Sequence, residues 1–77
     1  MELTLYTRSG CHLCDEMKTV ITRLRQRRSF VLSEVDISTD LSLERRYGRD
    51  IPVLLLDGVE VARHRIHEGD LWQMLAP

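Results

Sequence analysis

The sequence predicts an α/β protein: a four-stranded mixed sheet flanked by helices, with the element order βαβαββα. Residues 2–28 read as a strand and then a long helix, and a second strand-like segment follows. This is the pattern of a βαβ unit, whose two strands are parallel and joined by a right-handed crossover. An Asp-Gly pair between two apolar runs predicts an additional antiparallel hairpin. With 77 residues, we expect one compact domain over 1–77.

The first three elements follow from the spacing of the apolar residues. In residues 2–7, Leu3 and Leu5 alternate with Thr or Tyr, which is the period of a strand. In residues 12–28 the apolar positions recur at steps of three and four, which predicts a helix. Residues 29–37, "SFVLSEVDI", are rich in Val, Phe and Ile and predict the second strand.

The middle of the chain predicts a short second helix. Ser38, Thr39 and Asp40 are candidate N-caps, because their side chains can accept hydrogen bonds from free amides of the first turn. The helix is expected to end with Tyr47. Gly48 then stands where a left-handed C-cap residue is favoured.

The last elements are a hairpin and a terminal helix. Residues 51–64, "IPVLLLDGVEVARH", contain two strands joined by Asp57-Gly58. Residues 67–77 predict the final helix, with three apolar residues on one face: Leu71, Trp72 and Leu75. The core expected from these patterns consists of Leu3, Leu5, Val20, Ile21, Leu24, Val31, Val35, Val53, Leu55 and Leu71.

Composition and charge limit the partners of the chain. The net charge is −1 and the pI is about 6.3, so no global positive field attracts nucleic acid. Four arginines between residues 23 and 28 lie at the end of the predicted long helix, where cations complement the helix dipole. The longest apolar run, residues 53–56, is too short to cross a bilayer, and no signal-peptide pattern follows Met1. We therefore expect a soluble, cytoplasmic monomer that binds neither nucleic acid nor membrane.

Both cysteines lie in "YTRSGCHLCDEM", separated by two residues. A structural disulfide framework uses about four to eight cysteines, and a bridge over two residues closes too short a loop to stabilise a fold. At the start of a helix Cys11 would face free amides and the helix dipole, a setting in which a cysteine pKa falls to about 3.5–7.5. Cys14 lies one turn later on the same side. The spacing predicts Cys11 as the nucleophile and Cys14 as the resolving thiol.

Charged neighbours affect this pair in opposite directions. Arg8 adds positive potential before Cys11, whereas Asp15 and Glu16 oppose a thiolate. His12 either stabilises the thiolate when protonated or is a solvated side chain at the rim, and we favour the second reading. Tyr6 is either an aromatic residue at the rim of the site or a packing residue, and both interpretations stay open.

The strand "LTLYT", the C-x-x-C at the start of a helix and "DIPVLLLDG" downstream resemble the thioredoxin fold, most closely a glutaredoxin-like protein. Pro52 alone indicates only a strand start or an exposed edge. The resemblance implies that Pro52 is cis and lies beside the cysteines, and that the main chain of Ile51 pairs with an extended thiol substrate. Arg8 matches a basic residue that glutaredoxins keep to meet a glutathione carboxylate.

One part of the glutathione pattern is missing. Glutaredoxins that use glutathione have a Gly-Gly pair and then an acidic residue after the last strand, where the γ-glutamyl end is held. Here that region reads "ARHRIHEGDL", with only Gly69 and Asp70 in a shifted position. We favour the interpretation that Asp70 is an acidic residue in the first turn of the final helix over the interpretation that it binds glutathione.

The predicted function is a small thiol–disulfide oxidoreductase that reduces protein or low-molecular-weight disulfides. Cys11 and Cys14 are the expected catalytic residues, and Arg8, Ile51 and Pro52 are expected to bind substrate. We expect no metal and no bound organic cofactor, with glutathione open as a co-substrate and a thiol or a reductase as the electron donor.

Two other functions stay open. The first is zinc binding by cysteine thiolates and histidine imidazoles, for which the candidate ligands are Cys11, Cys14, His12, His64 and His67. A variant of this hypothesis is an iron–sulfur cluster that two chains share with glutathione. The chain could also be a module without catalysis that binds a partner through Ile51-Pro52.

Overall fold

The computed structural model describes residues 1–75; Ala76 and Pro77, which belong to the predicted final helix segment, lie outside the described residues. The elements are β1 (Glu2–Thr7), α1 (His12–Arg27), β2 (Val31–Asp36), the 3-10 turn η1 (Ile37–Thr39), α2 (Leu41–Tyr47), β3 (Val53–Leu56), β4 (Val59–Arg63) and α3 (Glu68–Leu75). The predicted order βαβαββα is confirmed. Only the short turn η1 was not expected.

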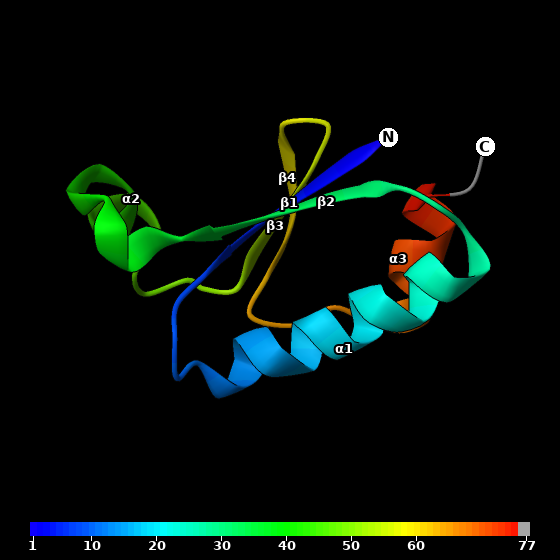
Figure 1. Cartoon of the computed structure of the whole chain (residues 1–77), viewed down its shortest axis with the longest axis horizontal. Helices are drawn as coiled ribbons and strands as arrows, with labels where there is room; N and C mark the ends of the chain where they lie inside the picture. Colours follow the sequence, from blue (N-terminus) through cyan, green and yellow to red (C-terminus); the bar gives the residue numbers. More distant parts are fainter. Residues whose placement is uncertain (76–77) are drawn as a thin grey trace.

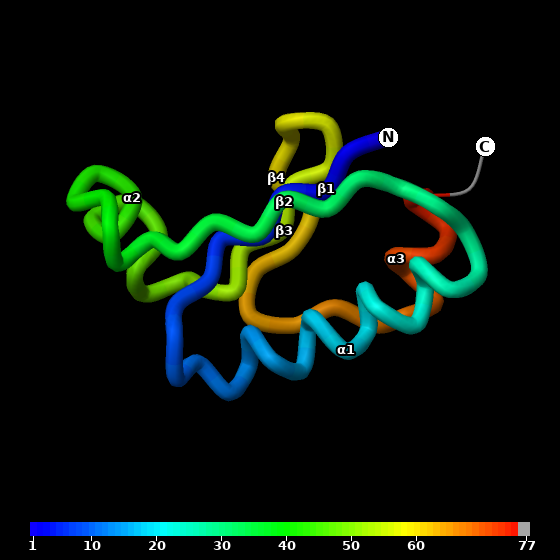
Figure 2. The backbone as a smooth tube through the Cα atoms, in the orientation of Figure 1, coloured from blue at the N-terminus to red at the C-terminus, as the bar shows by residue number. Residues whose placement is uncertain are grey.

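The four strands form one mixed sheet in the order β2-β1-β3-β4. β1 pairs in parallel with β2, whereas β1 and β3, and β3 and β4, are antiparallel. α1 and α3 lie side by side along one side of the sheet (Figure 1). α2 lies at the end of the sheet where β2 finishes, which is also the end where α1 begins, as the backbone trace shows (Figure 2).

The hairpin between β3 and β4 forms as the sequence predicts. Asp57 and Gly58 have φ values of 48° and 86°, and two positive φ angles in succession match the twist of a tight hairpin. Two hydrogen bonds also hold the turn to the neighbouring strand β1. The amide of Asp57 donates to the Glu2 carbonyl, and the amide of Glu2 donates to the Asp57 carboxylate, both at 2.8 Å.

The short helix α2 begins as predicted and ends differently. Asp40 is its N-cap, and the carboxylate accepts from two amides of the first turn. Gly48 is right-handed, with φ −54°, so the expected left-handed C-cap is wrong. The reason lies in the next residues, because the amides of Asp50 and Ile51 donate to the Tyr47 carbonyl at 2.8 and 3.1 Å. This carbonyl is therefore satisfied without a left-handed glycine.

The apolar side chains form two clusters, to which β1 and β3 contribute alternate residues. The larger cluster packs β1 and β3 against α1 and α3, and its buried members are Leu3, Leu5, Met17, Ile21, Leu24, Phe30, Leu54, Leu71 and Leu75. The smaller cluster lies near α2 and the start of α1 and contains Cys14, Ile37, Tyr47, Ile51 and Val53. Because β3 is an inner strand covered on both faces, Val53 and Leu54 are both fully buried.

The expected core needs one correction. Six of its residues are buried, and Val20, Val35 and Leu55 are half-buried. Val31 is wrong, because this side chain is 57% exposed. It stands at the start of β2, which is an edge strand with little cover. Among residues 1–75, no helix combines the length and hydropathy that a bilayer span requires.

Candidate active site

A tight turn places Cys11 at the start of α1. Gly10 has φ +80°, a conformation that is unfavourable for residues with a side chain. The amide of Cys11 donates to the Arg8 carbonyl at 3.3 Å, which closes this turn. Cys11 is the N-cap of α1, as predicted, with extended backbone angles.

The two cysteines form a disulfide, with their Cα atoms 5.2 Å apart. The amide of Cys14 donates a hydrogen bond to Cys11 Sγ at 3.1 Å. Cys11 is half-buried, whereas Cys14 is fully buried. An external sulfur can therefore reach Cys11 first, and Cys14 only through Cys11.

Aromatic and aliphatic side chains enclose Cys14. It packs in the smaller cluster with Ile51 and Val53. In the same cluster Tyr6 stacks on Tyr47, with ring centroids 4.6 Å apart and an interplanar angle of 16°. Tyr6 is therefore a packing residue of the cluster behind the cysteines.

The segment before β3 brings Ile51 into the cluster of Cys14, and Pro52 follows directly in the chain. Pro52 is fully buried, and the Ile51–Pro52 peptide bond is cis, as the resemblance implied. Ile51 is 8% exposed and packs in the cluster of Cys14. Its amide already donates to the Tyr47 carbonyl. The main-chain group of Ile51 that remains for a substrate is its carbonyl.

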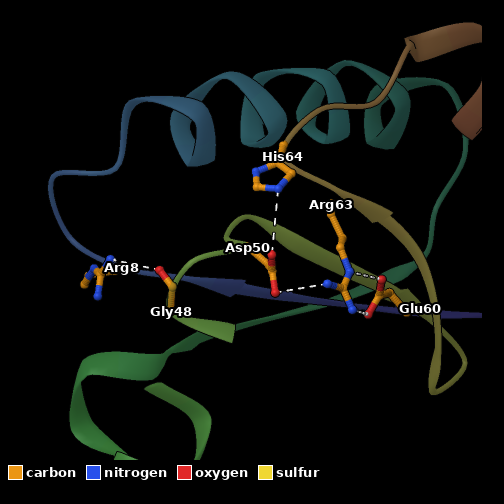
Figure 3. A network of polar contacts seen from close by, with 6 residues as sticks. All are labelled: Arg8, Gly48, Asp50, Glu60, Arg63 and His64. Carbon is orange, nitrogen blue, oxygen red and sulfur yellow. Dashed lines mark hydrogen bonds and ion pairs between the residues drawn. The ribbon is translucent and has the colours of Figure 1, made fainter. Parts of the chain in front are cut away.

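Arg8 connects the turn before Cys11 to α2. Its guanidinium forms an ion pair with Glu44 and donates to the Gly48 carbonyl at 3.3 Å, a contact drawn in Figure 3. Both charged side chains are about one-third exposed, at 38% and 35%. To bind a substrate carboxylate, Arg8 would have to exchange this contact with Glu44.

A chain of charged residues reaches from β4 to the segment before Pro52, and the sequence analysis did not predict it. Arg63 pairs with Glu60 and, at 3.0 Å, with Asp50; Asp50 Oδ1 lies 3.9 Å from His64 Nε2 (Figure 3). Hydrogen bonding to Arg63 lowers the pKa of Glu60, and the same contact raises the pKa of Arg63. The one available signal was an acidic residue placed directly before Ile-Pro.

Two other predicted residues lie at the rim or outside the site. The His12 side chain is 88% exposed and its Nε2 lies 3.8 Å from Glu16 Oε1, so it is a solvated rim residue. Asp70 is exposed in the first turn of α3, as expected of an acid at a helix start.

Trp72 packs against the larger cluster, with the Arg27 guanidinium 4.4 Å from the ring centroid.

Two hollows flank the start of α1. One, of about 370 Å³, lies between α1 and residues 64–67 and includes Leu13, the residue before Cys14. The other, of about 390 Å³, lies beside the turn before Cys11 and includes Thr7 and Gly10. Thr7 is 6% exposed, and its hydroxyl has no hydrogen-bond partner among residues 1–75.

The residues of the alternative zinc hypothesis do not converge. Within residues 1–75, no three His, Cys, Asp or Glu side chains are grouped as a metal site would need. Cys11 and Cys14 are bonded to one another, His12 points to solvent beside Glu16, and His64 faces Asp50.

Comparisons with known proteins agree with this geometry. The sequence model of a family described as Glutaredoxin-like domain (DUF836) matches residues 2–76. The Glutaredoxin-like protein YDR286C homolog of Dictyostelium discoideum is 27% identical over 78 residues, which cover 94% of this chain and 72% of that protein.

Solved structures share the fold. The X-ray structure of target protein XcR50 from X. campestris is 36% identical, with a TM-score of 0.79 over 97% of this chain and 99% of the other. Protein Ne2328 from Nitrosomonas europaea is 28% identical, with a TM-score of 0.81 over 97% and 91% of the two chains. A thioredoxin mutant from Halobacterium salinarum, 23% identical, has a TM-score of 0.66 over 96% and 70% and shows the fold alone.

Proposed function

Because the chain belongs to the glutaredoxin-like domain family and has the thioredoxin fold, we propose that it is a small thiol–disulfide oxidoreductase that reduces protein or low-molecular-weight disulfides. The observation that carries this proposal is the difference between the two cysteines. Cys11 is accessible and is the N-cap of α1, whereas Cys14 is fully buried and its amide donates a hydrogen bond to Cys11 Sγ. This arrangement suits an attacking thiolate and a second thiol that acts only on an intermediate.

The proposed reaction uses two exchanges. In the reduced protein the Cys11 thiolate attacks one sulfur of a substrate disulfide, the substrate S–S bond breaks, and the first substrate thiolate leaves. The Cys14 thiolate then attacks Cys11 Sγ, which forms the Cys11–Cys14 disulfide and releases the second substrate thiolate. The substrate gains two electrons and the protein loses two. A thiol or a reductase then returns the pair to the dithiol form.

The fold favours the first step through the start of α1. A thiolate at Cys11 keeps the hydrogen bond from the Cys14 amide, and the free amides of the first turn face the same negative charge. Asp15 is the acid in this first turn and opposes the thiolate by its charge. We propose that Pro52 and the carbonyl of Ile51 contact the substrate next to its sulfur, and that Arg8 binds a substrate carboxylate.

Several further properties belong to this proposal. The protein works without a resident metal or organic cofactor. Glutathione serves as a co-substrate if the Arg8 guanidinium exchanges its ion pair with Glu44 for one with a glutathione carboxylate. A protein that works as a reductase needs a compartment with a reducing thiol pool, so we propose a cytoplasmic location. We also propose that the whole domain acts as a monomer.

The test is a pair of serine variants with a peptide disulfide as substrate. Cys11→Ser is expected to abolish reduction of the peptide. Cys14→Ser is expected to accumulate a mixed disulfide on Cys11, visible by mass spectrometry as one peptide mass added to the protein. His12→Gln, at the solvated rim, is the control and is expected to stay within about twofold of the wild-type rate.

Two results would overturn the proposal. The first is full reductase activity in Cys11→Ser, because Cys11 would then not be the thiol that begins the reaction. The second is stoichiometric zinc in the purified protein by elemental analysis, because thiolates that hold a metal are not available as the reacting pair. A glutathione adduct on Cys11 in Cys14→Ser would identify glutathione as a partner.

A further inference from the structure

Two acceptors on α2, one helical turn apart, hold the Arg8 side chain. The guanidinium forms an ion pair with the Glu44 carboxylate and donates to the Gly48 carbonyl at 3.3 Å, the contact drawn in Figure 3. Because residues four apart lie on the same side of a helix, one guanidinium can reach both acceptors. Within residues 1–75, Glu44 is the only acidic residue that forms an ion pair with Arg8.

The Glu44 carboxylate lies against Gly48. A Cβ atom on Gly48 would stand 2.8 Å from Glu44 Oε1 and would also crowd the Glu44 carbonyl. The φ of Gly48 is −54°, a conformation that residues with side chains adopt readily. The absent side chain at this position therefore matters for space, since it leaves room for the carboxylate that reaches Arg8.

The main chain of Arg8 is bonded to that of the reacting cysteine. The Cys11 amide donates to the Arg8 carbonyl at 3.3 Å, and the Arg8 side chain is 38% exposed. In the proposed reaction the substrate sulfur comes to Cys11, and a substrate carboxylate comes to Arg8. Glu44 is therefore already bound to the group that this substrate carboxylate would use.

Two carboxylates compete for one guanidinium. A substrate that displaces Glu44 replaces one ion pair by a similar one, and the displaced carboxylate stays close, because Asp40 caps α2 and fixes its first turn. If Arg8 keeps Glu44 and binds the substrate with its other N–H groups, the two carboxylates repel each other. In both cases the substrate carboxylate gains little from Arg8, because the charge of Arg8 is already compensated.

From these observations we infer that Glu44 is a specificity-determining residue. It acts as an internal carboxylate that occupies Arg8 and suppresses the preference for disulfides with a carboxylate near the sulfur, glutathione disulfide included. This inference rests on the proposed function. Disulfides without a nearby carboxylate, such as those within a neutral stretch of polypeptide, are then reduced without a disadvantage.

The experiment compares two small symmetrical disulfides. Dithiodipropionate carries a carboxylate near each sulfur, whereas hydroxyethyl disulfide is neutral. The second-order rate constant for oxidation of the reduced protein is measured for each, by alkylation of the thiols that remain. The ratio of the two constants cancels any change in the reactivity of Cys11. The two leaving thiols are the same for every variant, so each ratio is compared with that of the wild type.

Variants of the ion pair then locate the effect. Glu44→Gln is expected to raise the ratio of the anionic to the neutral disulfide about two- to fivefold, because Arg8 loses its internal partner. Glutathione disulfide, measured against the same neutral disulfide, is expected to gain in the same direction. When Arg8→Gln is already present, Glu44→Gln is expected to change the ratio by less than about 1.5-fold, since only a distant charge is removed.

Glu16→Gln is the matched control. It also removes one carboxylate from the surface near Cys11, but Glu16 is 54% exposed and lies beside His12, at 3.8 Å, rather than beside Arg8. We expect its ratio to stay within about 1.5-fold of the wild type. The rate constant for the neutral disulfide shows that each variant is folded and active.

The outcomes separate this inference from the proposed function. An unchanged ratio in Glu44→Gln, with both disulfides reduced, overturns the role of Glu44 and leaves the oxidoreductase intact. A gain of the same size with Arg8→Gln present, or in Glu16→Gln, also overturns that role, because the lost negative charge rather than Arg8 would then cause the gain. Failure of the wild type to reduce either disulfide overturns the proposed function, and the inference with it.

Discussion

Replacing Thr7 by valine is expected to stabilise the protein. Thr7 is the last residue of β1 and is 6% exposed, and its hydroxyl oxygen is the only buried side-chain polar atom of residues 1–75 without a hydrogen-bond partner. In the unfolded chain water satisfies this hydroxyl, so folding loses a hydrogen bond and regains none. Valine has nearly the same shape, suits a strand at least as well, and has no polar atom to bury.

The magnitude follows from the cost of burying an unpaired hydroxyl. That cost is about 1–3 kcal/mol. We expect the lower half of this range, about 1–2 kcal/mol of additional stability, because Thr7 lines a hollow beside the turn before Cys11. For a chain of this size, each kcal/mol raises Tm by about 4–8 °C.

The assay is urea unfolding of the oxidised protein, followed by circular dichroism and by the fluorescence of Trp72. The midpoint should rise while the slope m stays the same, since the surface exposed on unfolding hardly changes. Thr7→Ser keeps the hydroxyl and loses a methyl group, so it should be less stable by about 1 kcal/mol. Thr4→Val, on the same strand but half-buried, is the matched control and should change stability by less than about 0.5 kcal/mol.

A lower midpoint for Thr7→Val would refute the reasoning, because the hydroxyl would then have a partner that valine removes. Water in the adjacent hollow is the obvious candidate for that partner. Equal gains for Thr7→Val and Thr4→Val would refute it as well, since the effect would then be strand preference alone.

Three other changes have expected outcomes. A double-mutant cycle with Arg8→Gln and Glu44→Gln should give a coupling of about 0.5–1 kcal/mol in urea unfolding, because both side chains are partly exposed, at 38% and 35%. Asp36→Asn should lower Tm at pH 7, and this difference in Tm should vanish in acid. Hydrogen bonds from the following turn lower the pKa of Asp36 below 3.8. The stability that the Asp36 carboxylate contributes is therefore present above pH 3.8 and is lost as the pH falls further. Gly58→Ala should cost about 1 kcal/mol because φ is +86°, whereas Gly69→Ala should gain about 0.5 kcal/mol, since a Cβ there meets no atom within 4 Å in a helix.

Each of these expectations has a result that contradicts it. Zero coupling in the cycle would mean that solvent screens the Arg8–Glu44 pair completely. A difference between Asp36→Asn and wild type that persists at pH 2 would assign the loss to packing rather than charge. Equal effects of the two glycine substitutions would show that φ does not control either position.

Local patterns were sufficient for most of the fold. The hairpin at Asp57-Gly58, the helix that begins after Cys11 and the N-cap at Asp40 each depend on residues close together in the sequence. The same holds for the asymmetry of the cysteines. The spacing of two residues places Cys14 one turn inside the helix on the same side, and burial follows from that side facing the sheet.

The features that the sequence did not predict depend on distant residues. Val31 is exposed because β2 lies at the edge of the sheet, and Leu54 is buried because β3 lies inside it; neither position is visible in an apolar pattern. The end of α2 at Gly48 is decided by amides two and three residues later. His64 reaches Asp50 only because β4 returns alongside β3.

The sulfur of Cys11 has two roles, since it is the proposed reacting atom and also the acceptor for the Cys14 amide at the first turn of α1. A thiolate is a stronger acceptor than a disulfide sulfur, so reduction should tighten this turn and oxidation should loosen it. Hydrogen exchange at the Cys14 amide would then record the redox state of the protein, slow in the dithiol form and faster in the disulfide form. The first turn of the helix would thus serve as a built-in reporter of electron transfer, without any label attached to either cysteine.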